Sequence, residues 1–155
     1  MCHRTCWKHS ISLALFLALC MPLAAWAVGN EPAPTPVVPR PAEAEYNKGL
    51  QAKAAQRFSE AVIDFRRAVS LRASYAEAWN ELGFALRQTG QYAEALKAYD
   101  QALRLRPTYP EALEYLGEAY VKLGRLDEAR AILGRLRPLD TARAHELDEA
   151  IRAER

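Results

Sequence analysis

The chain has 155 residues, which is room for one compact domain and little more. Hydrophobic residues make up 50% of it and charged residues 26%, a balance that suits a globular protein. The net charge of only +2 gives no support for a nucleic-acid partner.

Residues 1–27 have the pattern of a secretory signal peptide. Arg4 and Lys8 supply a positive start, and residues 11–23 form an uncharged run rich in leucine and alanine. Ala25-Trp26-Ala27 then provides the small-x-small pattern that signal peptidase cleaves. We therefore expect cleavage after Ala27 and a secreted or periplasmic mature protein.

Two alternatives to cleavage stay open. Residues 11–28 carry no charge and approach the length that spans a bilayer, so this segment is also compatible with an inner-membrane anchor. Lipidation at Cys20 is the second alternative, although Leu19 stands where a bacterial lipobox has a small residue. Either alternative would attach the protein to a membrane.

Cleavage after Ala27 would also change the chemistry of the chain. It removes Arg4 and Lys8, which leaves 19 basic against 19 acidic residues and a formally neutral protein. It also removes every cysteine of the chain, namely Cys2, Cys6 and Cys20. The mature protein would then have neither disulfides nor thiols, and its hydrophobic core alone would stabilise it.

Residues 28–41 form a proline-rich linker. Its prolines are Pro32, Pro34, Pro36, Pro39 and Pro41. Such a run favours an extended polyproline II conformation of about 3 Å per residue, which makes it a semi-rigid spacer. A proline-motif ligand for another domain is the alternative function.

The chain after the linker repeats itself every 34 residues, in segments 42–75, 76–109 and 110–143. The middle segment has small and large apolar residues at helical spacing, namely Trp79, Leu82, Gly83, Leu86, Tyr92, Ala95, Tyr99 and Ala102. The third segment follows in phase with Leu113, Leu116, Gly117, Tyr120, Leu126, Ala129, Leu133 and Leu136. The first is looser, with Gly49, Ala52, Phe58, Ala61, Phe65 and Ala68.

This pattern resembles the tetratricopeptide repeat. The resemblance implies an all-α fold, a right-handed α-solenoid of three helix-turn-helix repeats within residues 42–139. Gly90 and Gly124 suit the left-handed turn that ends a first helix, and Pro110 suits the first turn of the next repeat. In the first repeat Gln56 stands where those glycines stand, and we expect this repeat to be the least stable.

Residues 140–155 follow the third repeat and overlap its last residues. Ala144, Leu147, Ala150 and Ile151 fall on one side of a predicted helix from residue 140 to residue 153, and Arg143 falls on the side expected to face water. We interpret this segment as a capping helix that covers the last hairpin.

No catalytic constellation is recognisable in the sequence. After cleavage the chain keeps one histidine, His145, and no cysteine, and nothing resembles a phosphate loop or a cluster of metal ligands. We therefore predict that the protein is not an enzyme and has no catalytic residues, cofactor, metal or small-molecule substrate.

The family resemblance implies a binding groove lined by the first helix of each repeat. Its second, fifth, ninth and twelfth positions are Glu43, Tyr46, Leu50 and Lys53, then Glu77, Asn80, Phe84 and Arg87, then Glu111, Glu114, Glu118 and Val121. Apolar residues and bases dominate the first two sets, and the glutamates of the third form an acidic ladder suited to a basic residue of a partner. The alternatives are that Phe84 only packs against the next repeat and that the ladder is only a solvated face.

One known binding mode of the family is absent from the sequence. Co-chaperone members that clamp a C-terminal carboxylate have lysine and asparagine at the fifth and ninth positions of the first repeat, where this chain has Tyr46 and Leu50. Their later basic pair is replaced by Glu111 and Tyr115.

We therefore expect an adaptor or scaffold that binds a peptide or helix of a partner protein, with a role in cell-envelope assembly. The alternatives are a self-associating structural protein and a membrane-anchored or lipoprotein regulatory subunit.

Overall fold

The computed structural model describes residues 40–154. The predicted signal peptide, and the predicted linker up to residue 39, lie outside this range. Across the described residues no helix is both long enough and apolar enough to cross a bilayer.

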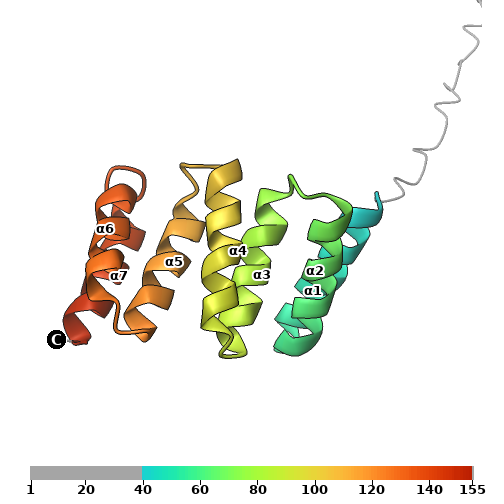
Figure 1. The fold of residues 1–155 in the computed structure, drawn as a ribbon, viewed down its shortest axis with the longest axis horizontal. Helices are drawn as coiled ribbons and strands as arrows, with labels where there is room; N and C mark the ends of the chain where they lie inside the picture. Colours follow the sequence, from blue (N-terminus) through green and yellow to red (C-terminus); the bar gives the residue numbers. More distant parts are fainter. Residues whose placement is uncertain (1–39, 155) are drawn as a thin grey trace, which may run out of the picture. The chain divides into compact units, whose positions relative to one another are not determined.

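The described chain consists of seven α-helices and no strand (Figure 1). Their bounds are α1 Pro41–Ala54, α2 Phe58–Leu71, α3 Ala76–Gln88, α4 Tyr92–Leu105, α5 Pro110–Lys122, α6 Leu126–Leu136 and α7 Thr141–Ala153. Figure 1 shows the helices standing side by side in a row, with successive connections alternating between two edges. The result is the all-α solenoid that the sequence predicts.

Successive helices pack as hairpins, α1 with α2, α3 with α4 and α5 with α6. Each hairpin then packs on the next, through α2 with α3 and α4 with α5. The last helix, α7, packs on both α5 and α6 and so covers the third hairpin. Pro41 and Pro110 occupy the first turns of α1 and α5, where a missing backbone N–H leaves no hydrogen bond unmade.

All three hairpins turn in the same way. The residue after each helix cap has a positive φ, 57° at Gln56, 78° at Gly90 and 69° at Gly124. In the first turn the amide of Arg57 donates to the carbonyl of Ala52 at 2.9 Å, and the equivalent bond closes the other two turns. Gln56 therefore adopts the left-handed conformation of its glycine counterparts, even though it has a side chain.

The core runs between the two layers of each hairpin. Phe65 on α2 and Tyr99 on α4 are completely buried, and each ring lies directly over a glycine of the preceding helix. A methyl group on Gly49 or on Gly83 would approach ring carbons of Phe65 or Tyr99 to 2.6 Å. The glycines therefore allow each pair of helices to approach closely around a large aromatic side chain.

Candidate functional site

The twelve predicted groove residues all lie on α1, α3 and α5, the first helices of the three repeats. We call the side of the solenoid formed by these helices the A-helix face. Tyr46, Leu50 and Phe84 are half-buried on it, whereas Asn80 is only 2% exposed and Glu114 only 5%. A partner could therefore contact the three apolar residues, whereas Asn80 and Glu114 are almost inaccessible to it.

Several aromatic side chains lie on the first helices of the repeats or directly before them. We call five of them the aromatic row, and its members are Tyr46, Tyr75, Phe84, Tyr109 and Tyr115, all half-buried. The rings of Tyr46 and Tyr75 have centroids 4.9 Å apart, and those of Phe84 and Tyr115 are 5.4 Å apart. Phe84 thus packs against Tyr115 of the next repeat, which is the packing role that the sequence left open for it. Part of its side chain nevertheless stays accessible.

The tyrosines of the row are protonated at neutral pH, as tyrosines ordinarily are, and burial raises their pKa further. Burial raises the pKa of Tyr109 to about 12, the nearby Arg106 acts in the opposite direction, and the acidic groups Glu111, Glu77 and Glu81 add to the rise. Burial also raises the pKa of Tyr46, and the Glu81 carboxylate adds to the rise. Their hydroxyls are therefore neutral hydrogen-bond donors at physiological pH.

Sequence reasoning missed Tyr75, Tyr109 and Glu81 as members of this face. Tyr75 and Tyr109 each directly precede the first helix of a repeat and are 34 residues apart, a spacing that could have identified them. Glu81 directly follows Asn80, one of the predicted groove residues, in the sequence. Its carboxylate pairs with Lys53 at 2.5 Å. That pairing joins side chains of two repeats, so only the fold reveals it.

The cations of the A-helix face are already paired within the chain. Lys53, besides its contact with Glu81, lies over the Phe84 ring with its nitrogen 4.6 Å from the centroid. Arg87 pairs with Glu118 of the next repeat at 3.0 Å and lies near the rings of Phe84 and Tyr115. These contacts link the predicted bases to aromatic rings and acids of neighbouring repeats.

The first two repeats share one further arrangement at the start of the first helix. In the first repeat Arg72 pairs with Glu43 at 3.1 Å and lies 3.6 Å above the centre of the Tyr75 ring. In the second repeat, 34 residues later, Arg106 pairs with Glu77 and lies over Tyr109. These glutamates, too, have partners within the chain.

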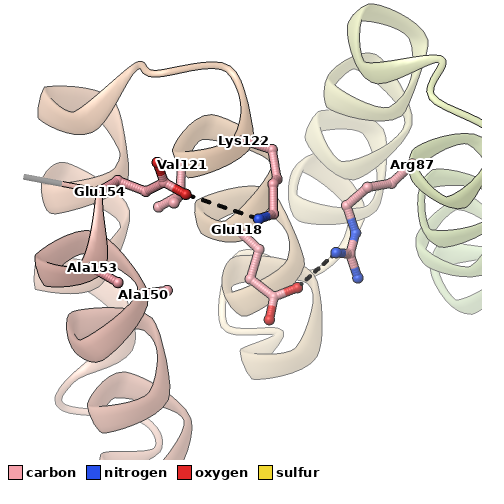
Figure 2. A pocket seen from close by; sticks show the side chains of 7 residues that line it. All are labelled: Arg87, Glu118, Val121, Lys122, Ala150, Ala153 and Glu154. Atoms are coloured by element: carbon pink, nitrogen blue, oxygen red, sulfur yellow. Dashed lines mark ion pairs between the residues drawn. The ribbon is translucent and has the colours of Figure 1, made fainter.

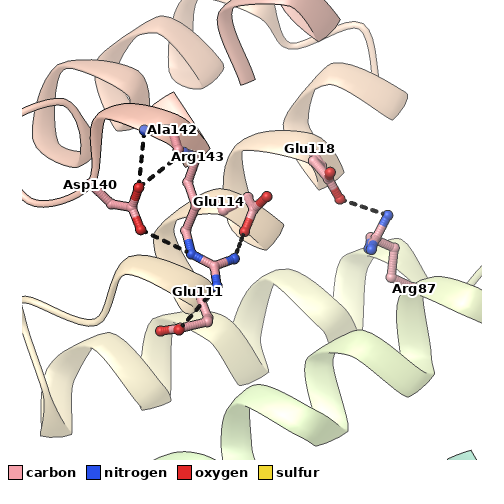
Figure 3. A network of polar contacts seen from close by, with 7 residues as sticks. All are labelled: Arg87, Glu111, Glu114, Glu118, Asp140, Ala142 and Arg143. Atoms are coloured by element: carbon pink, nitrogen blue, oxygen red, sulfur yellow. Dashed lines mark hydrogen bonds and ion pairs between the residues drawn. The ribbon is translucent and has the colours of Figure 1, made fainter. Parts of the chain in front are cut away.

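The acidic ladder is occupied by an arginine of the chain itself, as Figure 3 shows. Arg143 of α7 contacts Glu111 at 3.2 Å, pairs with Glu114 and also contacts Asp140 at 3.2 Å. The expectation that Arg143 faces water was therefore wrong, because its side chain turns toward α5. Burial raises the pKa of the Glu114 carboxyl, although Arg143 acts in the opposite direction.

A small cleft lies at the end of the face between α3, α5 and α7 (Figure 2). It has a volume of about 220 Å³, and the Arg87–Glu118 pair forms one side of it. Lys122 and Glu154, which are 4.0 Å apart, form a second side of the cleft. Val121 of α5 and Ala150 and Ala153 of α7 line the remainder, so the cleft is part apolar and edged by charge pairs.

Residues 40–154 contain no group of three or more histidine, cysteine or acidic side chains arranged to hold a metal. His145 lies exposed on α7, 3.8 Å from Glu149. The A-helix face instead provides aromatic surface and hydrogen-bonding groups, which suit association with another molecule.

Two family models, each described as tetratricopeptide repeat, match residues 46–110 and residues 86–151. No curated protein matches the sequence. The Arabidopsis OM64 TPR domain superposes with a TM-score of 0.70 at 20% identity, covering 74% of this chain and 97% of that one.

Two similar structures were determined with peptides. The first TPR of Spaghetti (RPAP3), bound to the HSP90 peptide SRMEEVD, has a TM-score of 0.68 at 21% identity and covers 73% of this chain and 92% of that one. The second TPR domain of human RPAP3, in complex with the HSP70 peptide SGPTIEEVD, has a TM-score of 0.68 at 23% identity, with coverages of 72% and 94%. At these identities the similarity establishes the fold.

Proposed function

The chain belongs to the tetratricopeptide-repeat family across residues 46–151, and from that premise we propose that it is an adaptor that binds a segment of another protein on its A-helix face. The observation that carries the proposal is the aromatic row, since half-buried rings gathered on one side of a solenoid form the kind of surface that protein partners cover.

The partner segment would differ from the chaperone peptides held by the similar structures. Those peptides end in the acidic sequence EEVD. The positions at which carboxylate-clamping members of the family carry lysine and asparagine hold Tyr46 and Leu50 here. The bases that are present, Lys53 and Arg87, already pair with Glu81 and Glu118. We therefore propose a partner that does not depend on a terminal carboxylate.

We further propose that the adaptor acts outside the cytoplasm, in assembly of the cell envelope. The support comes from residues 1–27, whose basic start, uncharged run and Ala25-Trp26-Ala27 fit an export signal. Mass spectrometry of the protein from a bacterial host should find a mature chain that begins at Val28. A chain that retains Met1, or one that carries lipid at Cys20, would replace this proposal with the corresponding membrane-attached form.

In-cell photo-crosslinking tests the binding face directly. Phe84 is replaced by a photo-crosslinking amino acid in the full chain, and Lys97, exposed on α4, is replaced in a matched control. A discrete adduct with another protein from position 84, absent from position 97, is the expected result. Adducts from position 97 alone would move the function to the opposite face and overturn the proposal.

Self-association is the competing function, and the fold restricts it. Because α7 packs on α5 and α6, it blocks stacking of a second copy on that end of the described helices, which leaves their α1–α2 end. Ile63 of α2, 52% exposed, is a large apolar residue of that hairpin. Light scattering of the protein over a range of concentrations should show a monomer, and a rise in mass that Ile63→Lys abolishes would favour self-association.

A further inference from the structure

We propose that the segment bound on the A-helix face is uncharged, rich in proline and extended, and that it lies along the aromatic row. This inference rests on the proposed function and specifies its partner. It follows from three properties of the face, which are the spacing of its rings, the state of its hydroxyl groups and the internal pairing of its charges.

The rings recur along the solenoid as an extended ligand requires. Tyr75 directly precedes α3 and Tyr109 directly precedes α5, so the first two repeat boundaries each contribute one tyrosine at the start of a first helix. Tyr46 contacts Tyr75, and Tyr115 contacts Phe84. Proline-rich segments bind to surfaces of this kind because their pyrrolidine rings pack on aromatic side chains while the chain itself is already extended.

The length of the row is consistent with a short segment. The first helices α3 and α5 are in contact, and packed helices lie about 8–10 Å apart, so two such steps, from α1 to α3 and from α3 to α5, cover roughly 20 Å. Polyproline II rises about 3.1 Å per residue, and about seven residues would cover that distance. A linear segment of this length fits the row without a turn.

The tyrosine hydroxyls match the backbone of such a segment. A polyproline II chain makes no internal hydrogen bonds, so its carbonyl oxygens remain free acceptors. The hydroxyls of Tyr46 and Tyr109, like those of any tyrosine, are protonated at neutral pH and can donate. The row therefore offers donors to a ligand that has acceptors and, at its prolines, no N–H groups of its own.

The charges beside the row favour an uncharged ligand. Glu81, whose charge adds to the raised pKa of Tyr46 and of Tyr109, pairs with Lys53 at 2.5 Å. Equivalent pairs are Glu43 with Arg72, Glu77 with Arg106 and Glu118 with Arg87. A charged partner would have to break one of these pairs to gain its own, whereas an uncharged partner binds without that loss.

The chain contains a sequence of the required chemistry, which supplies the probe. Residues 32–39 contain Pro32, Pro34, Pro36 and Pro39 and no charged residue. A fluorescent peptide of this sequence is titrated with the full chain in mild detergent, and separately with a full chain whose four prolines are replaced by alanine. The second titration removes competition from the chain's own copy.

We expect saturable binding of the peptide to at least one of the two chains. An alanine version of the peptide should bind at least about tenfold more weakly. Tyr109→Ala should weaken binding by a similar factor, and Tyr109→Phe, which keeps the ring and the fold, by a smaller one. The matched control is Tyr92→Ala, because Tyr92 begins α4 and lies off the A-helix face. It should leave the affinity unchanged.

Three outcomes would overturn the inference. These are no binding to either chain, equal binding of the alanine peptide, and an equal loss of affinity in Tyr92→Ala and Tyr109→Phe. The crosslinking at position 84 stays informative in each case. An adduct with another protein there, together with a failed proline peptide, would retain the adaptor and reject only the proline-rich partner.

Discussion

In the first two repeats a glycine in the first helix packs under an aromatic ring of its own hairpin, whereas in the third repeat it packs under a different helix altogether. Gly83 lies against Tyr99 of α4, but Gly117 lies against Leu147 of α7, whose Cδ2 is 2.5 Å from the position of an added methyl group. The third repeat has Leu133 where the second has Tyr99. This leucine is smaller than the ring, and Leu147 of α7 fills the space that remains.

The polar residues at the end of each repeat also differ between the first two repeats and the third. The first two repeats place an arginine and a tyrosine three residues apart, as Arg72 with Tyr75 and as Arg106 with Tyr109. At the equivalent positions the third repeat has Asp140 and Arg143. Asp140 accepts hydrogen bonds from the amides of Ala142 and Arg143, both at 3.1 Å, and so begins α7.

The comparison shows how the solenoid ends. An inner repeat obtains its packing and its ion pairs from its own hairpin and from the repeat that follows. The third repeat has no following repeat in the described chain, and α7 supplies both. The substitutions at positions 133, 140 and 143 are therefore coupled to the presence of this one helix.

The largest expected effect separates the two kinds of packing. Gly83→Ala should destabilise the protein by about 3 kcal/mol, because the new methyl group meets the fully buried Tyr99 ring, which has no room to move. Gly117→Ala should cost less, about 1–2 kcal/mol, because the buried Leu147 that it meets can shift to another rotamer and alanine favours a helix. Urea unfolding of both variants measures the difference, and equal losses would contradict the comparison.

An intermediate effect concerns the arginines. Arg143→Ala should cost about 2 kcal/mol near neutral pH, since it leaves the buried Glu114 carboxylate without its partner. Arg106→Ala should cost less than about 1 kcal/mol, because both members of its pair are substantially exposed.

The pH dependence of this loss follows from Glu114. Burial raises its pKa in the folded protein, so the folded state holds the proton more strongly than the unfolded state does. Stability from this group is present at low pH and is lost as the pH rises through the raised pKa. The deficit of Arg143→Ala should therefore shrink toward about pH 4. A deficit that is constant between acid and neutral pH in urea unfolding would argue against this role.

The smallest effect compares the three hairpin turns. Gln56→Gly should leave stability unchanged or raise it by up to about 1 kcal/mol, because glycine adopts a φ of 57° without the strain of a side chain. The reverse change in an equivalent turn, Gly90→Gln, should lower stability by a similar amount. Thermal unfolding of the pair tests this, and a clear loss in Gln56→Gly would show that the glutamine side chain stabilises its turn.

The sequence by itself determined the repeat fold and its helices. The 34-residue period and the spacing of residues such as Leu82, Gly83 and Leu86 predict paired helices, because local periodicity decides which side of a helix is buried. It also identified Gln56 as the residue equivalent to Gly90, and the left-handed φ of Gln56 agrees. These properties depend on residues that are close together in the sequence, so they can be predicted from the sequence alone.

Only the tertiary structure decided which side chains of the A-helix face remain available to a partner. Lys53 meets Glu81, Arg87 meets Glu118 and Arg143 meets Glu114, and each pair joins residues about 30 positions apart. Periodicity can place such residues on one side of a helix. Their pairing depends on how neighbouring repeats and α7 are oriented, which is a property of packing between helices and not of any single one.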